Sequence, residues 1–463
     1  MKNCLLSQGL ILGIIILFIG ASVIPSTIGI IAKKTTFSGS KSSGYIQGLI
    51  DHASDGDTIY IPSGIYFENI VINKSISIIG EDKDTTIIDG GGNGVVTYIS
   101  ADWVNFSRFT VRNGDTYPET GPSGIEIDSK YNNISNNNII FNHKFGIGIS
   151  HQCCNIIMNN TIIMNDNYGI FMIGAYRNTI KCNVISNNGG GIYDSSGSGN
   201  LITGNTFLDD GIYLVDSFDI SNDKIIDNSF YNAGLFLGWP YSFHRIVDGN
   251  TVNGKPLVYL QDESDKIITN AGQVILARCF NITVETLDLS NTSVGIELCK
   301  TYNCTLRKNI CSNNFYYGIY LRDSKNNNIS DNYISSNKWD GINLYNSRYN
   351  NISYNHIISN DNKGIKLYDS NNNILKSNKI NLNRFGILPI ESNNNTILKN
   401  NFHNNKLQAS FNNCTNTWEN NYWDRPRIFP KIIFGTRSLG NFIIPFPWFN
   451  IDWSPAQKPY DIS

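Results

Sequence analysis

An asparagine returns every 22 or 23 residues along two long stretches of this chain, and no other feature restricts the fold as strongly. A period of this length is typical of stacked repeats, in which each repeat contacts only its neighbours. The asparagines that keep the period are Asn137, Asn160, Asn183, Asn205, Asn228, Asn250, Asn309, Asn332, Asn355, Asn378 and Asn400. The chain is therefore expected to form a solenoid.

A glycine followed by alternating apolar residues repeats with the same period, as in Gly318–Leu321 and Gly341–Leu344. Alternation of period 2 indicates a strand with one buried face. The ladder asparagine introduces a second short strand, and Asn-, Asp-, Ser- and Gly-rich turns separate the strands. Three short strands with their turns fill one coil, which predicts an all-β fold: a single-stranded, right-handed parallel β-helix with 22–23-residue coils.

We interpret the asparagine ladder as a structural feature. Asparagine tolerates the left-handed backbone conformation at a corner, and a stacked amide can bond the coils on either side of it. The Asp-Ser pairs that follow several glycine strands, such as Asp323-Ser324 and Asp369-Ser370, are interpreted as capped turns. A row of carboxylates there could hold Ca²⁺, but Asn346 and Glu391 interrupt the row.

The ends of the chain differ from the repeats. Tyr45–Ala53 places Ile46, Leu49 and Ile50 on one helical face, which predicts a short amphipathic helix capping the open end of the β-helix. The predicted organisation is an apolar signal peptide or membrane anchor at 1–33, a linker at 34–44, the β-helix at 45–423 with an irregular insertion at 235–294, and a carboxy-terminal cap at 424–463.

Composition and the amino terminus restrict the partners and the compartment. The formal net charge is −2 and no run of Lys or Arg occurs, which argues against nucleic acid. The apolar segment at 1–33 predicts export, so the location is extracellular, cell-surface or periplasmic, with membrane contact only through this segment. The eight later cysteines permit disulfides in such a compartment, with Cys279, Cys299, Cys304 and Cys311 the favoured source and the pairing open.

Several stretches resemble NosD-type β-helix proteins. They are Asp55–Tyr66, Ile78–Glu81, Thr86–Gly90, Phe109–Asn113, Asn250–Leu257 and Asn421–Trp423. The resemblance covers about Tyr45 to Trp423. It implies a carbohydrate-binding and sugar-hydrolase type β-helix at the cell surface or in the periplasm. Because the family is associated with copper through nitrous oxide reductase maturation, a periplasmic copper-binding or metalloenzyme-maturation protein is an alternative function.

A copper site would need thiolate, thioether or imidazole ligands. His151, Cys153 and Cys154 are the candidates, with Met158, Met164 and Met172 nearby in sequence. Against a site, Met164 and Met172 are expected to face the core. Paired cysteine spacings are also missing from this stretch.

A polysaccharide lyase or glycoside hydrolase is an alternative function, since hydrolysis needs two carboxylates beside the scissile bond. Asp209 and Asp210 form the adjacent pair that comes nearest to this requirement. They precede a repeat glycine, where a solvated turn is the ordinary explanation. We therefore assign no catalytic residue from the sequence.

Carbohydrate binding is the function that we favour from the sequence, with a cell-envelope polysaccharide as the partner. Outward strand positions align tyrosines with polar groups, and a flat strip of this kind suits a sugar chain. The candidate binding residues are Tyr320, Arg322, Trp339, Tyr345, Lys366 and Tyr368. A structural surface rod or adhesin is the remaining alternative.

Overall fold

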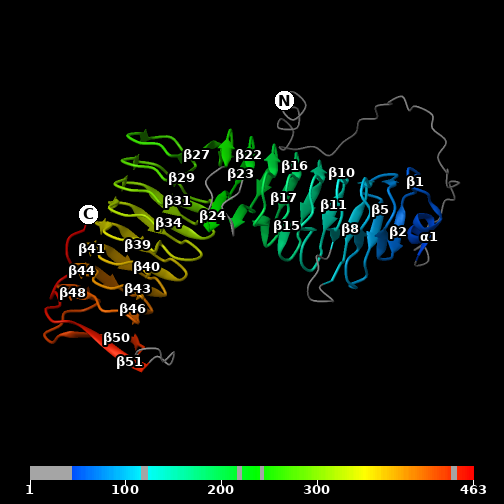
Figure 1. Ribbon diagram of the computed structural model, residues 1–463. Coiled ribbons are helices and arrows are strands. Elements are labelled where there is room, and N and C mark those ends of the chain that lie inside the picture. The colour runs from blue at the N-terminus through cyan, green and yellow to red at the C-terminus, as the bar shows by residue number, and fades with distance from the viewer. Residues whose placement is uncertain (1–43, 116–123, 216–221, 240–244, 439–445, 463) are drawn as a thin grey trace. The chain divides into compact units, whose positions relative to one another are not determined.

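The computed structural model describes residues 44–115, 124–215, 222–239, 245–438 and 446–462, which form two compact units. Unit 1 comprises the described residues up to Ser229, together with Arg245 and Ile246; unit 2 comprises Phe230–Trp239 and the described residues from Val247 onward. Each unit is a stack of β-coils, and the predicted right-handed parallel β-helix is confirmed (Figure 1). The predicted export segment at 1–33 and the linker up to residue 43 lie outside the described residues.

Unit 1 has three walls of parallel strands, each strand pairing with the equivalent strand of the next coil. The first wall contains β1 (Thr58–Ile61), β4 (Ser77–Gly80), β7 (Asn105–Ser107), β10 (Asn133–Ser135), β13 (Ile156–Met158), β16 (Thr179–Lys181), β19 (Leu201–Thr203) and β22 (Lys224–Ile226). The second contains β2 (Gly64–Phe67), β5 (Thr86–Asp89), β8 (Thr110–Arg112), β11 (Asn138–Ile140), β14 (Thr161–Ile163), β17 (Val184–Ser186) and β20 (Thr206–Leu208). The third contains β3 (Ile70–Ile72), β6 (Thr97–Ile99), β9 (Ile125–Ile127), β12 (Ile147–Ser150), β15 (Tyr168–Ile173), β18 (Gly190–Ser195) and β21 (Ile212–Val215).

Unit 2 repeats the arrangement. Its glycine-strand wall contains β27 (Lys255–Gln261), β29 (Gln273–Ala277), β31 (Val294–Cys299), β34 (Tyr317–Arg322), β37 (Ile342–Tyr345), β40 (Lys363–Tyr368), β43 (Phe385–Ile390), β46 (Leu407–Ala409) and β47 (Phe411–Asn412). The next wall contains β28 (Ile267–Ile268), β30 (Thr283–Glu285), β32 (Thr305–Arg307), β35 (Asn328–Ser330), β38 (Asn351–Ser353), β41 (Ile374–Lys376), β44 (Thr396–Leu398) and β48 (Thr417–Glu419). The last contains β33 (Ile310–Ser312), β36 (Tyr333–Ser335), β39 (His356–Ile358), β42 (Lys379–Asn381), β45 (Asn401–His403) and β49 (Tyr422–Trp423).

Each unit has a distinct terminal element. In unit 1, α1 (Tyr45–His52) buries Ile46 and Ile50 beside β1 and β3, as its amphipathic pattern predicts. In unit 2, β50 (Lys431–Arg437) and β51 (Phe446–Asp452) form an antiparallel pair that continues the wall beyond β47 and β48. These elements occupy positions where a solenoid would otherwise expose unpaired strand edges.

The ladder asparagines are buried and bonded between coils. Asn332 donates its backbone N–H and its Nδ2 to Asn355 Oδ1, both at 3.0 Å, and Asn355 does the same to Asn378. Asn355 Nδ2 also donates to Ile329 O, in the preceding coil, at 2.8 Å. The ladder therefore satisfies turn groups that are shut off from water.

The left-handed conformation belongs to the residue before the ladder asparagine, so our explanation of the corner was wrong. Asp331 and Tyr354 have φ values of 58° and 57°, whereas Asn332 and Asn355 are outside the left-handed region. Two further asparagine ladders, which the sequence analysis missed, run through successive coils. In unit 1 they include Asn155, Asn178 and Asn200 at one corner and Asn142, Asn165 and Asn188 at another.

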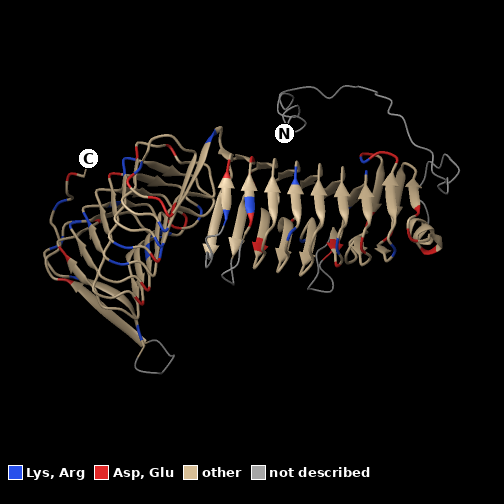
Figure 2. Ribbon diagram, turned by 45° about the horizontal axis from the view of Figure 1, so that its top comes forward, with Lys and Arg blue, Asp and Glu red and all other residues tan. Residues whose placement is uncertain are grey.

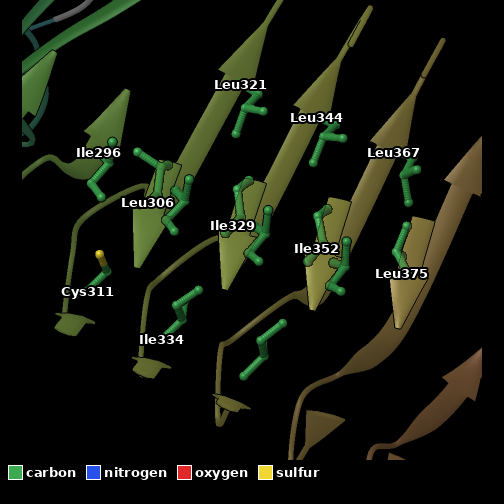
Figure 3. Close-up of a cluster of buried hydrophobic side chains, with 14 of the residues drawn as sticks. Ile296, Leu306, Cys311, Leu321, Ile329, Ile334, Leu344, Ile352, Leu367 and Leu375 are labelled. Carbon is green, nitrogen blue, oxygen red and sulfur yellow. The ribbon is translucent and has the colours of Figure 1, made fainter. Parts of the chain in front are cut away.

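The core of unit 2 consists of aligned columns of aliphatic side chains (Figure 3). Leu321, Leu344 and Leu367 come from the glycine strands and are fully buried. The glycine is required because a Cβ at Gly318 would lie 2.7 Å from Gly341 O in the next coil. Cys311 packs in this core, as expected, and all eight described cysteines are free thiols.

The irregular segment of unit 2 is short. β26 (Thr251–Val252) pairs antiparallel with β27, but from Leu257 the strands resume the parallel register of the following coils. The regular coils thus reach well into the predicted insertion at 235–294. β23 (Ser229–Tyr231) and β25 (Ile246–Asp248) span the boundaries between the units, and β24 (Leu235–Trp239) belongs to unit 2.

Candidate functional site: the outward faces of the glycine strands

The outward side of β34, β37 and β40 brings the sequence-predicted binding residues into two columns. Tyr320, Asn343 and Lys366 are in register in one column, and Arg322, Tyr345 and Tyr368 in the other. The rings of Tyr345 and Tyr368 stack with centroids 5.2 Å apart and an interplanar angle of 8°. Trp339 lies at the adjoining corner and is 42% exposed. We call Trp339, Tyr345, Lys366 and Tyr368 the Tyr345 strip.

Two predicted residues are not accessible, because β24 lies over them. Tyr320 and Arg322 are each 5% exposed. The Phe236 ring packs against Tyr320, with centroids 5.6 Å apart, and Arg322 Nη1 donates to Gly238 O at 3.0 Å. These two side chains therefore hold the covering segment and leave the Tyr345 strip as the accessible part.

Buried polar side chains on the neighbouring strands hold the same segment. Leu235 N donates to Gln273 Oε1 at 3.0 Å, and Leu237 N donates to Glu297 Oε2 at 3.1 Å. Gln273 and Glu297 occupy outward positions yet are fully buried. Their side chains thus accept hydrogen bonds from two backbone N–H groups of β24.

Cations gather beside the Tyr345 strip. Lys366 Nζ lies 5.9 Å from the Tyr368 ring centroid, and the Arg322 guanidinium lies 5.5 Å from that of Tyr345. Burial lowers the pKa of Lys363; the charge of Asp340 opposes this change, and the charges of Lys366 and Arg384 add to it. An anionic group at the surface would favour the charged form of Lys363.

One carboxylate accompanies these cations. Asp340 is nearly fully buried, accepts a hydrogen bond from Asn343 Nδ2 at 2.8 Å and lies 3.9 Å from Lys363 Nζ. Burial raises the pKa of Asp340, and Lys363 and Lys366 oppose the rise. Asp340 Oδ1 also accepts a hydrogen bond from Lys363 N at 3.1 Å. Asp340 therefore fixes both Asn343 and the backbone of Lys363.

A second outward face, in unit 1, was missed by the sequence analysis. Its central column runs in register from Tyr98 on β6 through Glu126, Gly148, Phe171 and Tyr193 to Tyr213 on β21. The aromatic residues at alternating positions after the repeat glycines were the signal available in the sequence. Figure 2 shows few charged residues along the strands of unit 1. We call the outward side of β6, β9, β12, β15, β18 and β21 the Glu126 face.

Aromatic rings form a continuous row on the Glu126 face. Phe145 stacks on Phe171 with centroids 4.0 Å apart and an interplanar angle of 4°, and Phe171 stacks on Tyr193 at 5.1 Å. Tyr193 then meets Tyr213 edge-on at 5.6 Å. Gly148 on β12 has no side chain to place in this column. The ring of Phe145, which precedes β12, supplies the aromatic contact of that coil instead.

Two carboxylates adjoin the aromatic row. Asp128 accepts hydrogen bonds from Tyr98 Oη at 2.7 Å and from Gln152 Nε2 at 2.8 Å. Burial and the charge of Asp128 raise the pKa of Glu126 to about 7, against an opposing effect of Lys144. Glu126 is therefore an acid that exchanges its proton near neutral pH.

A family model described as "Periplasmic copper-binding protein (NosD)" matches residues 50–234 and 243–443. The chain belongs to the NosD family. No curated protein sequence matches this NosD-family chain.

Solved structures with similar folds include three carbohydrate-active proteins. The catalytic domain of GH87 alpha-1,3-glucanase in complex with nigerose has a TM-score of 0.40 and 14% identity, covering 71% of this chain and 66% of that one. An alginate lyase from Paenibacillus sp. str. FPU-7 has a TM-score of 0.37 and 15% identity, with coverage of 58% and 93%. The periplasmic alginate epimerase AlgG has a TM-score of 0.29 and 14% identity, with coverage of 67% and 84%. The chain thus spans just under two thirds of the glucanase domain.

The family description raises the question of copper, and the described residues do not fit a copper centre. Cys154 Sγ lies 3.0 Å from Cys153 Sγ, but burial raises the pKa of the Cys154 thiol, which disfavours the thiolate that copper prefers. His151 is exposed, and its ring lies against Gly174. Within the described ranges, no three His, Cys, Asp or Glu side chains form a set that could hold a metal ion.

The nearby methionines divide between core and surface. Met172 is fully buried, as predicted, whereas Met164 is 45% exposed, so the expectation that it faces the core was wrong. Met164 has a φ of 56° and sits at the left-handed corner just before Asn165. The side chain at such a corner points away from the packed interior.

The predicted carboxylate pair at Asp209 and Asp210 takes part in a ladder. Asp210 is buried and accepts hydrogen bonds from Asn188 Nδ2 at 2.7 Å and from Asn188 N at 2.9 Å. Asp209 is exposed at a left-handed corner, with a φ of 60°. Burial raises the pKa of Asp210 to about 6. Asp210 thus accepts the same two hydrogen bonds from the preceding coil that Asn188 accepts from Asn165.

The described residues include no helix long and apolar enough to cross a membrane.

Proposed function

We propose that the chain binds carbohydrate outside the cytoplasm through the Tyr345 strip, and that it binds without cleaving. The stacked pair Tyr345 and Tyr368 carries this proposal, because two parallel rings on successive coils present a continuous apolar surface to a sugar chain. Trp339 extends the aromatic surface at the corner, and Lys366 supplies a hydrogen-bond donor beside it.

The charge around the strip favours an acidic polysaccharide. Lys366 and Arg384 lie close enough to Lys363 to lower its pKa, and Asn343 donates a hydrogen bond to Asp340 beside them. A uronate carboxylate could accept hydrogen bonds from these cations while the pyranose ring lies on Tyr368. The location outside the cytoplasm is consistent with the description of the NosD family as periplasmic.

Affinity electrophoresis of the full chain tests this proposal, with gels containing polygalacturonate or its fully methyl-esterified form. We expect retardation in the anionic gel and much less in the esterified one. The double variant Tyr345→Ala/Tyr368→Ala should lose at least tenfold in affinity, whereas Tyr345→Phe/Tyr368→Phe, which keeps both rings, should retain it. Release of reducing ends should stay at the level of a blank.

Equal retardation of the wild type and the alanine double variant would remove the Tyr345 strip from the proposal. Migration of the wild type that no polygalacturonate concentration changes would contradict binding of an acidic glycan. Release of reducing ends by the wild type would contradict binding without cleavage.

A further inference from the structure

We propose that the Glu126 face is a second carbohydrate site, which takes an uncharged polysaccharide laid along the aromatic row of unit 1, and that Glu126 couples this binding to a proton. The site lies wholly within unit 1 and does not depend on the Tyr345 strip.

The aromatic row provides the platform. Each coil advances by about 4.8 Å, the spacing of paired strands, so equivalent outward positions present one ring per coil. Phe145, Phe171 and Tyr193 stack in sequence with interplanar angles of 4° and 10°. Phe171, Tyr193 and Tyr213 are half-buried, so part of each ring remains at the surface.

Polar groups flank the row on the adjacent column. Asp128 directly follows β9, and Ser150 and Ser195 are the last residues of β12 and β18. Ser150 and Ser195 are each in register with Ile173. Asp128 is fixed by Tyr98 Oη and Gln152 Nε2. Hydroxyls and a fixed carboxylate beside stacked rings are suited to the hydroxyl groups of a sugar ring.

The charge of this face selects against an acidic glycan. Glu126 and Asp128 both raise the negative charge at the amino-terminal end of the row, and Lys144 Nζ lies 5.0 Å from the Phe145 ring centroid. The groups that face Glu126 are Asp128 on its own strand, Tyr98 on β6 and Lys144 before β12. A uronate would meet two carboxyl groups, whereas a neutral hexose can donate to them.

A sugar placed over Glu126 removes more water from a carboxyl group that is already largely buried. This favours the protonated form, so the complex takes up a proton and affinity rises as the pH falls from 8 to 6. If the bound sugar raises the pKa by about one unit, the affinity changes roughly fivefold over this range.

The experiment uses the full chain in affinity gels that contain laminarin, dextran, soluble starch or hydroxyethylcellulose, at pH 6 and pH 8. We expect retardation by at least one of these uncharged polymers, stronger at pH 6. Phe171→Leu, which keeps an apolar side chain but removes the ring, and Tyr193→Ala should each weaken retardation at least fivefold. Glu126→Gln should bind equally at both pH values.

Controls separate this site from the proposed function. Tyr345→Ala/Tyr368→Ala should leave retardation by the uncharged polymer unchanged, and Phe171→Leu should leave retardation by polygalacturonate unchanged. Thermal unfolding confirms that each variant is folded. The inference is overturned if none of the four polymers retards the wild type, if both ring variants bind as the wild type does, or if the pH dependence survives in Glu126→Gln.

Discussion

The outward faces of the glycine strands differ between the two units although the coils beneath them are built alike. In unit 1 the face presents Phe171 and Tyr193 beside the carboxyl group of Glu126. In unit 2 it presents Tyr345 and Tyr368 beside lysines, and part of it is covered by β24. The inward side chains and the turn asparagines stabilise the coil. The outward residues can therefore differ in charge and aromatic content without altering it.

Removing the cover of unit 2 should have the largest effect. Phe236→Ala deletes a buried ring that packs against Tyr316 at 4.8 Å and against Tyr320 at 5.6 Å. We expect the free energy of unfolding to fall by about 3 kcal/mol, the usual effect of emptying such a site. Urea denaturation measures the loss, and nitration of Tyr320 by tetranitromethane should become faster.

Phe280→Ala is the matched control, because Phe280 is 48% exposed and should lose far less stability. If Phe236→Ala leaves both the unfolding free energy and the nitration of Tyr320 unchanged, β24 does not cover Tyr320.

The asparagine ladders provide the second test of how alike the units are. Asp210 stands where the corresponding unit 2 ladder, through Asn337, Asn360 and Asn383, has only amides. Its pKa is about 6 in the folded chain, above the ordinary 3.8, so its favourable contribution is present below pH 3.8 and lost as the pH rises through 6. Asp210→Asn should therefore stabilise the chain at pH 7 by about 2 kcal/mol and have little effect at pH 4.

Urea denaturation at the two pH values measures the Asp210→Asn effect. Asp209→Asn, at the exposed neighbour, should change stability little at either pH. A stability gain that is the same at pH 4 and pH 7 would mean that the charge of Asp210 is not its cause.

The smallest expected effect concerns the charge that distinguishes the faces. Lys366→Gln removes one partly exposed cation near Tyr368, and we expect the dissociation constant for polygalacturonate to rise about threefold, the scale of an exposed charge pair. The difference from the wild type should diminish as salt rises. Lys379→Gln, on another wall of unit 2, is the control. Identical salt dependence in Lys366→Gln and the wild type would exclude this lysine from glycan binding.

Short-range pattern was sufficient for the scaffold. The period of Asn332 and Asn355 and the alternation after Gly318 predicted the coil, its inward residues and the helix at Tyr45–His52, because each depends on neighbours at a fixed sequence distance. The register that aligns Tyr345 with Tyr368 followed from the same period. The period did not show which residue at each corner is left-handed, because asparagine occurs at both the ladder position and the corner position.

By itself, the sequence determined the repeat, the family resemblance and the columns of outward residues, because a solenoid turns sequence period directly into spatial neighbours. Only the tertiary structure decided which outward residues are accessible. β24 covers Tyr320 and Arg322. Its Gly238 lies 84 residues before Arg322 in the sequence, and this separation does not follow the repeat period. The acidity of Glu126 was likewise decided by burial and by Asp128, which depend on how the surrounding side chains pack.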